Sequence, residues 1–289
     1  MSARSSTRTS LLALAAFVGL GIGCSKDNDA PPPLASAAPS SSAAKPPLKV
    51  AAAADLAFAF KDVAEAYEKK TGQKVVFSFG STGLLAKQIS EGAPFDVFAA
   101  ANISFIDDVV KAKSCLDDSK TLYARGRIVV WTKKGSPKPA SLADLKDKKY
   151  AKVAIANPEH APYGRAAKEA LTKVGAWDSV SPRLVFGENV QQTLQFAQSG
   201  NAEASIVALS LAVGPAANDG EYTMIDPELH APLDQALVVC HGAPEAKDAR
   251  IPDARAFTQF VSSEDGRTIM KRYGFLLPGE TLSSTTAKP

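Results

Sequence analysis

The chain has 289 residues, and its 33 basic and 30 acidic residues give a formal net charge of only +3. This near balance, without a basic cluster interleaved with aromatic side chains, argues against a nucleic-acid-binding surface. The length is sufficient for one large or two medium-sized domains.

The first 23 residues are typical of an export signal, with two arginines before an apolar stretch at residues 11–23. That stretch is shorter than the roughly 20 residues that a membrane-spanning helix needs. The run Leu20-Gly21-Ile22-Gly23-Cys24 resembles a bacterial lipobox, although Leu20 lies four residues before the cysteine and the pattern usually places it three before. We therefore predict a lipoprotein signal peptide at 1–23 and a lipid on Cys24. Simple cleavage and an uncleaved anchor are the alternatives.

Residues 24–47 consist largely of Ala, Ser and Pro. Such a segment cannot bury enough apolar surface to fold, so we predict a disordered tether and a folded body from about Leu48 to about Leu277. If Cys24 carries a lipid, the remaining cysteines are Cys115 and Cys240. They permit one disulfide in an oxidising compartment, and two isolated buried thiols are an equal alternative.

The folded part alternates short apolar runs with helical patterns. The runs predict strands at 49–54, 75–79, 96–101, 127–132, 153–156, 184–186, 204–209 and 237–239. Helical spacing follows most of them, at 55–71, 84–90, 141–145, 163–174, 190–198 and 254–273. Near-continuous apolar strands between amphipathic helices are typical of parallel sheets covered on both faces. The predicted fold class is α/β.

A pair of hydroxyls framed by glycines, Gly80-Ser81-Thr82-Gly83, joins the second predicted strand to the helix that follows. Free backbone N–H groups, two hydroxyls and the positive end of a helix dipole suit an anion. The motif lacks the lysine of a phosphate-binding Walker loop, and it is not Gly-x-Gly-x-x-Gly. Taken alone, it also fits an ordinary N-capped turn.

Three more predicted helices begin just after a strand with residues suited to a negative ligand. Asp55 opens the first of these helices, Pro162 and Tyr163 the second, and Asn189 and Val190 the third. Ligands of open α/β sheets gather at the carboxyl ends of the strands. Helix starts placed there provide N–H and hydroxyl donors to a small anion without a cationic partner.

Together these motifs resemble the molybdate-binding substrate-binding proteins of ABC importers. The resemblance rests on seven ordered motifs, at residues 50–56, 80–89, 92–98, 157–164, 187–194, 207–210 and 271–275. It implies a two-lobed fold in which each lobe is a mostly parallel sheet flanked by helices. We expect one lobe at 48–125 with 228–289 and the other at 126–227, because two chain crossings make a hinge.

The resemblance also implies a function. The receptor would close on molybdate or tungstate and deliver the ion to an ABC permease in the inner membrane. It would be a monomer, periplasmic or at the cell surface, and anchored by its N-terminal lipid. The contacts implied for molybdate are Asp55, Ser81, Thr82, Tyr163 and Val190, with Thr82 and Val190 touching oxyanion oxygens rather than the metal. A tyrosine that some members contribute would fall on Ala208, so Tyr163 is the candidate substitute.

Asp55 departs from the family pattern, which has Ser or Asn there, because a carboxylate aimed at a dianion would repel it. We expect its side chain to cap its own helix by accepting from the N–H of Ala57 or Phe58, while a nearby backbone N–H faces the ligand. The alternative is that the carboxylate lines a wider site for an octahedrally ligated or differently protonated oxyanion.

Two other functions stay open. A receptor for sulfate or phosphate would use the same donors, because selectivity among tetrahedral dianions depends on cavity size. An exported enzyme on the same fold is less favoured: Ser81 and Ser210 lack a Gly-x-Ser-x-Gly frame, and the three histidines, His160, His230 and His241, lack metal-ligand spacing. We therefore expect a receptor with no catalytic residue and no cofactor.

Overall fold

The computed structural model describes residues 45–244 and 248–280. The predicted signal peptide at 1–23, the lipid on Cys24 and the tether up to residue 44 lie outside the described residues. Among the helices of the described ranges, none combines the length and the apolar character needed to cross a membrane.

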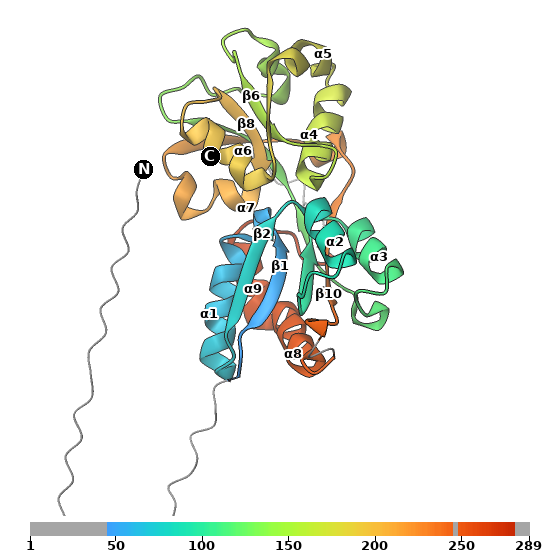
Figure 1. Ribbon diagram of the computed structural model, residues 1–289. Helices are drawn as coiled ribbons and strands as arrows, with labels where there is room; N and C mark the ends of the chain where they lie inside the picture. The colour runs from blue at the N-terminus through green and yellow to red at the C-terminus, as the bar shows by residue number, and fades with distance from the viewer. Residues whose placement is uncertain (1–44, 245–247, 281–289) are drawn as a thin grey trace, which may run out of the picture. The chain divides into compact units, whose positions relative to one another are not determined.

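The strands of residues 45–244 and 248–280 form two five-stranded sheets (Figure 1). The first sheet has the order β2-β1-β3-β10-β4, with β1 at Leu48–Ala53, β2 at Val75–Gly80, β3 at Val97–Ala100, β4 at Thr121–Gly126 and β10 at Leu233–Val239. The second has the order β7-β6-β8-β5-β9, with β5 at Ile128–Lys133, β6 at Val153–Ala156, β7 at Leu184–Gly187, β8 at Ala204–Ala208 and β9 at Gly220–Met224. The predicted α/β class is confirmed.

The two sheets share one pattern of pairing. In the first, β1 is parallel to β2 and β3, while β10 is antiparallel to β3 and β4. In the second, β6 is parallel to β7 and β8, while β5 is antiparallel to β8 and β9. The parallel strands β1, β3, β6 and β8 are almost fully buried, as expected of strands covered on both faces.

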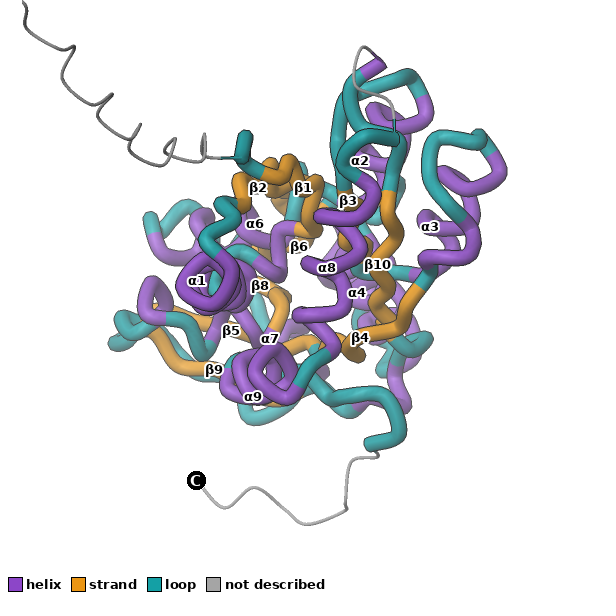
Figure 2. The backbone as a smooth tube through the Cα atoms, turned by 90° about the horizontal axis from the view of Figure 1, so that it is seen from below, coloured by secondary structure: helices purple, strands orange, loops and turns teal. Residues whose placement is uncertain are grey.

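Helices cover both faces of the first sheet (Figure 2). On one face Phe60 of α1 meets Phe257 of α8 edge to face, with ring centroids 6.4 Å apart. On the other, Leu85 of α2 and Ile106 of α3 pack on Phe98. The α-helices are α1 at Ala59–Thr71, α2 at Thr82–Ser90, α3 at Ile103–Lys111, α4 at Pro162–Lys173, α5 at Trp177–Val180, α6 at Val190–Gln198, α7 at Leu209–Ala212, α8 at Ile251–Ser262 and α9 at Glu264–Arg272.

Within the described ranges, six short 3-10 helices connect these elements. They are η1 at Ala54–Leu56, η2 at Asp117–Ser119, η3 at Leu142–Lys146, η4 at Ser181–Arg183, η5 at Pro215–Ala217 and η6 at Pro227–Leu229. The prediction that an α-helix begins at Asp55 is therefore wrong for the first turn. Asp55 belongs to η1, and α1 begins only at Ala59.

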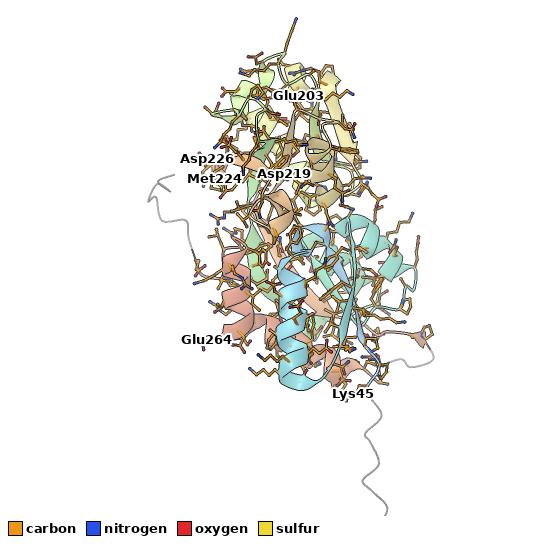
Figure 3. All side chains as sticks on the ribbon, turned by 90° about the vertical axis from the view of Figure 1, so that its left-hand side faces the viewer. Lys45, Glu203, Asp219, Met224, Asp226 and Glu264 are labelled. Atoms are coloured by element: carbon orange, nitrogen blue, oxygen red, sulfur yellow. A yellow bond between two sulfur atoms is a disulfide. The ribbon has the colours of Figure 1, made fainter. Side chains whose placement is uncertain are left out.

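Two strands escaped prediction, β4 and β9. Both are edge strands that pair antiparallel with their neighbours. β4 mixes buried with exposed positions and β9 has only half-buried and exposed ones, so neither is a continuous apolar run. Met224 at the end of β9 is 41% exposed, and it lies at the surface beside Asp226 (Figure 3). An antiparallel strand can face water on one side, and this weakens the apolar signal.

Cys115 and Cys240 form a disulfide, with their Cα atoms 3.8 Å apart. Cys115 lies beyond α3, and Cys240 follows β10 directly. The bond joins residues 125 apart in sequence. The loop that it closes contains the whole second sheet. Of the two alternatives that the sequence left open, the structure contains the disulfide.

Candidate functional site

A small cavity lies where β1, β2 and several helix starts meet. Its volume is about 10 Å³ for the centre of a water-sized sphere, which is the space of about one water molecule. It is lined by Ala53, Ala54, Asp55, Gly80, Ser81, Thr82, Ala101, Ala161, Pro162, Tyr163, Asn189 and Val190. The structure thus brings all five predicted contact residues to one cavity. A tetrahedral ion enters it only if the walls separate.

Strand register explains why distant segments meet here. Ala53 at the end of β1 pairs with Gly80 at the end of β2, so η1 and α2 begin side by side. In the second sheet Ala156 at the end of β6 pairs with Gly187 at the end of β7, which places the starts of α4 and α6 together. Parallel strands that end at one edge deliver their following helices to that edge.

Thr82 and Val190 keep donors available at the cavity. The Thr82 hydroxyl accepts from the backbone N–H of Ala101 over 3.2 Å, so its own proton is left to donate. Val190 is the first residue of α6. The cap of that helix is Asn189, whose Oδ1 accepts from the N–H groups of Gln191 and Gln192 at 3.0 Å each. The cap therefore leaves the Val190 N–H free for another acceptor.

Ser81 is engaged in a contact between the two sheets' loops. Its hydroxyl lies 2.9 Å from the carbonyl oxygen and 2.8 Å from Nδ1 of His160. The N–H of Gly83 donates to the same carbonyl over 3.0 Å. An added Cβ on Gly83 would lie 2.7 Å from that oxygen, so glycine is needed for this approach. Sequence reasoning missed His160, because nothing in its local pattern indicates a partner 79 residues away.

The Asp55 side chain does not cap its helix, so that prediction is wrong. No side-chain cap bond forms at η1. Oδ2 of Asp55 instead accepts from the hydroxyl of Tyr163 over 2.9 Å and from Nε2 of Gln235 over 2.6 Å. The hydroxyl of Ser210 donates to the Asp55 carbonyl oxygen over 2.7 Å. The carboxylate is thus bonded by Tyr163 and Gln235, while the N–H of Ala57 donates to the carbonyl oxygen of Ala54.

The Asp55 carboxyl is almost completely buried, at 1% exposure. Burial raises its pKa from the usual 3.8 to about 6, although the hydrogen bonds from Gln235 and Tyr163 oppose the rise. Burial, and next the nearby Asp55, raise the pKa of Tyr163 well above its usual value. No lysine or arginine is among the cavity-lining residues.

Gln235 and Tyr123 complete this network and were missed. Oε1 of Gln235 accepts from the Tyr123 hydroxyl over 2.7 Å, and Nε2 also lies 3.1 Å from the Tyr163 hydroxyl. A signal was present, since Gln235 is a polar residue directly before the apolar run at 236–239 of β10, and it is fully buried there. A buried amide in an apolar strand needs polar partners.

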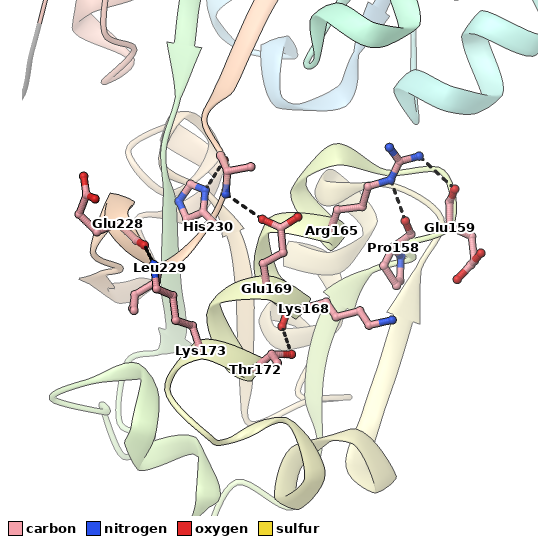
Figure 4. Close-up of a pocket in the computed structure, with 11 residues that line it drawn as sticks. Pro158, Glu159, Arg165, Lys168, Glu169, Thr172, Lys173, Glu228, Leu229 and His230 are labelled. Carbon is pink, nitrogen blue, oxygen red and sulfur yellow. Dashed lines mark hydrogen bonds between the residues drawn. The ribbon is translucent and has the colours of Figure 1, made fainter.

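A larger pocket of about 780 Å³ lies between α4 and η6 (Figure 4). Its charged groups bind the pocket's own walls: Arg165 donates to the carbonyl oxygens of Pro158 and Glu159, and Glu169 accepts from the N–H of Ala231. These bonds hold the loop before α4 and the chain after η6 against the helix. We therefore assign the pocket a structural role.

Residues 48–276 match a family model described as bacterial extracellular solute-binding protein. The chain belongs to this family. A molybdate-binding protein ModA from Azotobacter vinelandii is 34% identical over 233 residues, which cover 79% of this chain and 89% of that protein. YvgL of Bacillus subtilis, which carries the name of an ABC transporter substrate-binding lipoprotein, is 30% identical over 271 residues, covering 92% of this chain and 96% of that protein.

A solved structure of this solute-binding family, the Azotobacter vinelandii periplasmic molybdate-binding protein, superimposes with a TM-score of 0.72. It is 29% identical and covers 80% of this chain and 99% of its own. The predicted family and the two-lobed fold are thereby confirmed.

Proposed function

We propose that this chain is the extracytoplasmic receptor of an ABC importer and that it binds molybdate or tungstate in the cavity that Asp55, Ser81, Thr82, Tyr163 and Val190 line. One observation carries the proposal: four segments that begin just after strands, from both sheets, converge on a cavity that no cationic side chain lines. Hydroxyls and backbone N–H groups suit an oxyanion there. The names of the matched ModA relatives support molybdate as the ion.

The lobes that close on the ion are residues 48–125 with 228–289, and residues 126–227. The strand content of the two sheets supports this division, because β5 to β9 all lie within the second range. At the first crossing, the guanidinium of Arg127 donates twice to the carbonyl oxygen of Gly274, over 2.9 and 2.7 Å. The chain crosses back near Asp226 and Pro227. Two adjacent crossings restrict the motion to opening and closing.

The five proposed contact residues differ in whether their hydrogen-bond donors are available to the ion. Thr82 and Val190 have donors available and would bind oxyanion oxygens directly, not as metal ligands. The hydroxyl protons of Ser81 and Tyr163 are bonded to His160 and Asp55, so the ion must displace or redirect them. Ion binding and lobe movement are therefore coupled events.

The receptor would act as a monomer, periplasmic or at the cell surface, held at a membrane by a lipid on Cys24 and by the tether up to residue 47. The lipoprotein name of YvgL supports the anchor. Delivery to a membrane permease would follow recognition of the closed form, which is the form that brings both lobes into one surface.

A receptor for a protonated oxyanion such as hydrogen phosphate is the second candidate, and Asp55 favours it. A buried carboxylate accepts a hydrogen bond from an anion that carries its own proton, whereas it repels one that has none. Sulfate carries no proton near neutral pH, so it cannot donate to an ionised Asp55.

Thermal unfolding of the mature chain with molybdate, tungstate, sulfate and phosphate in parallel tests the proposal. We expect the midpoint to rise with molybdate and tungstate, because a ligand that binds only the folded state stabilises it in proportion to its occupancy. A rise with phosphate alone would favour the second candidate. No rise with any of the four ions would contradict both.

A further inference from the structure

We propose that Asp55 takes up one proton when molybdate binds, so that its neutral carboxyl group donates a hydrogen bond to the ion, and that Gln235 positions this proton. The inference rests on the proposed function, because it places the ion in the cavity that Asp55 lines. It assigns Asp55 a donor role and Gln235 a positioning role.

The two oxygens of Asp55 have different surroundings. Oδ2 accepts two hydrogen bonds, from the Tyr163 hydroxyl at 2.9 Å and from Gln235 Nε2 at 2.6 Å. Oδ1 is buried and has no hydrogen-bond partner within residues 45–244 and 248–280. A proton on the carboxyl group must therefore sit on Oδ1, since Oδ2 already faces two donors. Oδ1 is the oxygen left for a group in the cavity.

Gln235 is held in the orientation that enforces this arrangement. Its amide oxygen accepts from the Tyr123 hydroxyl over 2.7 Å, so its amide nitrogen faces Asp55. The side chains of Tyr123 and Gln235 both belong to strands of the first sheet, β4 and β10, and both are buried. Tyr123 thus acts on Asp55 through Gln235, without touching the cavity.

Among the described residues, no lysine or arginine lines the cavity to compensate for the charge of Asp55. The titratable groups that face Asp55 are Tyr163 from α4 and Tyr123 from β4. The elements α6, α7 and β2, which also pack on η1, contain no charged residue. Arg125 and Asp234, the charged neighbours of this network on β4 and β10, pair with each other over 2.6 Å at the surface. The other titratable group at the cavity is His160, through its bond to Ser81.

A dianion beside an ionised carboxylate in such a site is strongly unfavourable. Burial raises the pKa of Asp55 to about 6 against the opposing hydrogen bonds from Gln235 and Tyr163, and a dianion at hydrogen-bond distance would raise it further. At neutral pH the empty site is therefore mostly ionised and the occupied site neutral. One proton from solvent binds the carboxylate, and no other bond is made or broken. Above about pH 6 the affinity should fall by up to tenfold for each pH unit.

Calorimetry of the mature chain with sodium molybdate, at about pH 7 in buffers of different ionisation enthalpy, measures this proton directly. The wild type should take up close to one proton per ion. Asp55→Asn should take up none and should lose the pH dependence, because its amide donates at every pH. If Asp55→Asn does not fold, Asp55→Ser replaces it in the experiment, because serine also cannot take up a proton in this pH range. His160→Gln is the matched control and should keep the uptake.

Gln235→Met tests the positioning role. It removes a donor to the ionised carboxylate, so the pKa of Asp55 in the empty protein rises, and the onset of the pH dependence should move to higher pH. A merely structural role would lower stability and leave that onset unchanged.

Molybdate binding without proton uptake, or with an uptake that Asp55→Asn keeps, would overturn the inference and leave the proposed function standing. An absence of molybdate binding by the wild type would overturn the function itself.

Discussion

The hydroxyl of Tyr163 donates to Oδ2 of Asp55 over 2.9 Å, between residues 108 positions apart in the chain. Tyr163 follows a strand of the second sheet and Asp55 a strand of the first. The bond therefore links the two lobes at the cavity, and it is shielded from water. A buried hydrogen bond to a charged group is among the stronger polar contacts in proteins.

Tyr163→Phe should remove this link and leave Asp55 with one donor. We predict a loss of about 1–3 kcal/mol in the free energy of unfolding and a molybdate affinity at least about tenfold weaker. Denaturant unfolding and calorimetry check the two effects. Tyr222→Phe on the exposed face of β9 is the control. If the Tyr163 variant and the wild type were equal in stability and affinity, the hydrogen bond between Tyr163 and Asp55 would contribute to neither.

The stability of the ion-free protein should depend on pH through Asp55. Its pKa is raised in the folded state from 3.8 to about 6, so its stabilising contribution is complete below about pH 3.8 and is lost as pH rises through 6. The difference corresponds to about 3 kcal/mol. Asp55→Asn lacks this loss, so its stability relative to the wild type should increase by that amount between about pH 4 and pH 7. Denaturant unfolding at several pH values measures the difference. A difference that does not vary with pH would contradict the assignment.

Gly83→Ala should weaken molybdate binding. An added Cβ would lie 2.7 Å from the carbonyl oxygen of His160, which belongs to the other lobe, and 3.1 Å from a ring carbon of Phe105 in the first lobe, so the closest clash arises when the lobes meet. We expect an affinity at least about tenfold lower. Lys87→Ala, on the exposed face of the same helix, should bind as the wild type does. Were both variants to bind equally well, the close approach at His160 would not be needed for binding.

Replacing both Cys115 and Cys240 with serine should lower the free energy of unfolding by about 3–5 kcal/mol, because the disulfide closes a loop of over 100 residues in the unfolded chain. Denaturant unfolding under oxidising conditions measures the loss. The wild type with reductant is the control and should approach the variant. An unchanged unfolding midpoint would mean that the disulfide contributes little to stability by constraining the unfolded chain.

The sequence was informative where local patterns decide the structure. The apolar runs of β1, β2, β6 and β7 were recognisable, and because their carboxyl ends align, the helix starts after them meet at one cavity. Thr82 and Val190 could be placed there for that reason. The antiparallel edge strands β4 and β9 gave no comparable signal, whereas the parallel edge strands β2 and β7 did.

The partners of Asp55 could not be predicted in the same way. A capped helix start is a local expectation, and it failed because Tyr163 and Gln235 reach the carboxylate from 108 and 180 residues away. Such contacts depend on how the two sheets approach each other. No pattern within a few residues of Asp55 contains that information.

A crystal structure of the protein with molybdate, phased or checked with anomalous scattering from molybdenum, tests the central claim most directly. We predict one ion between Thr82 and Val190, within hydrogen-bond distance of the Thr82 hydroxyl and the Val190 N–H, and without a lysine or arginine side chain on its oxygens. An ion bound elsewhere, or one neutralised by a cationic side chain, would contradict the account.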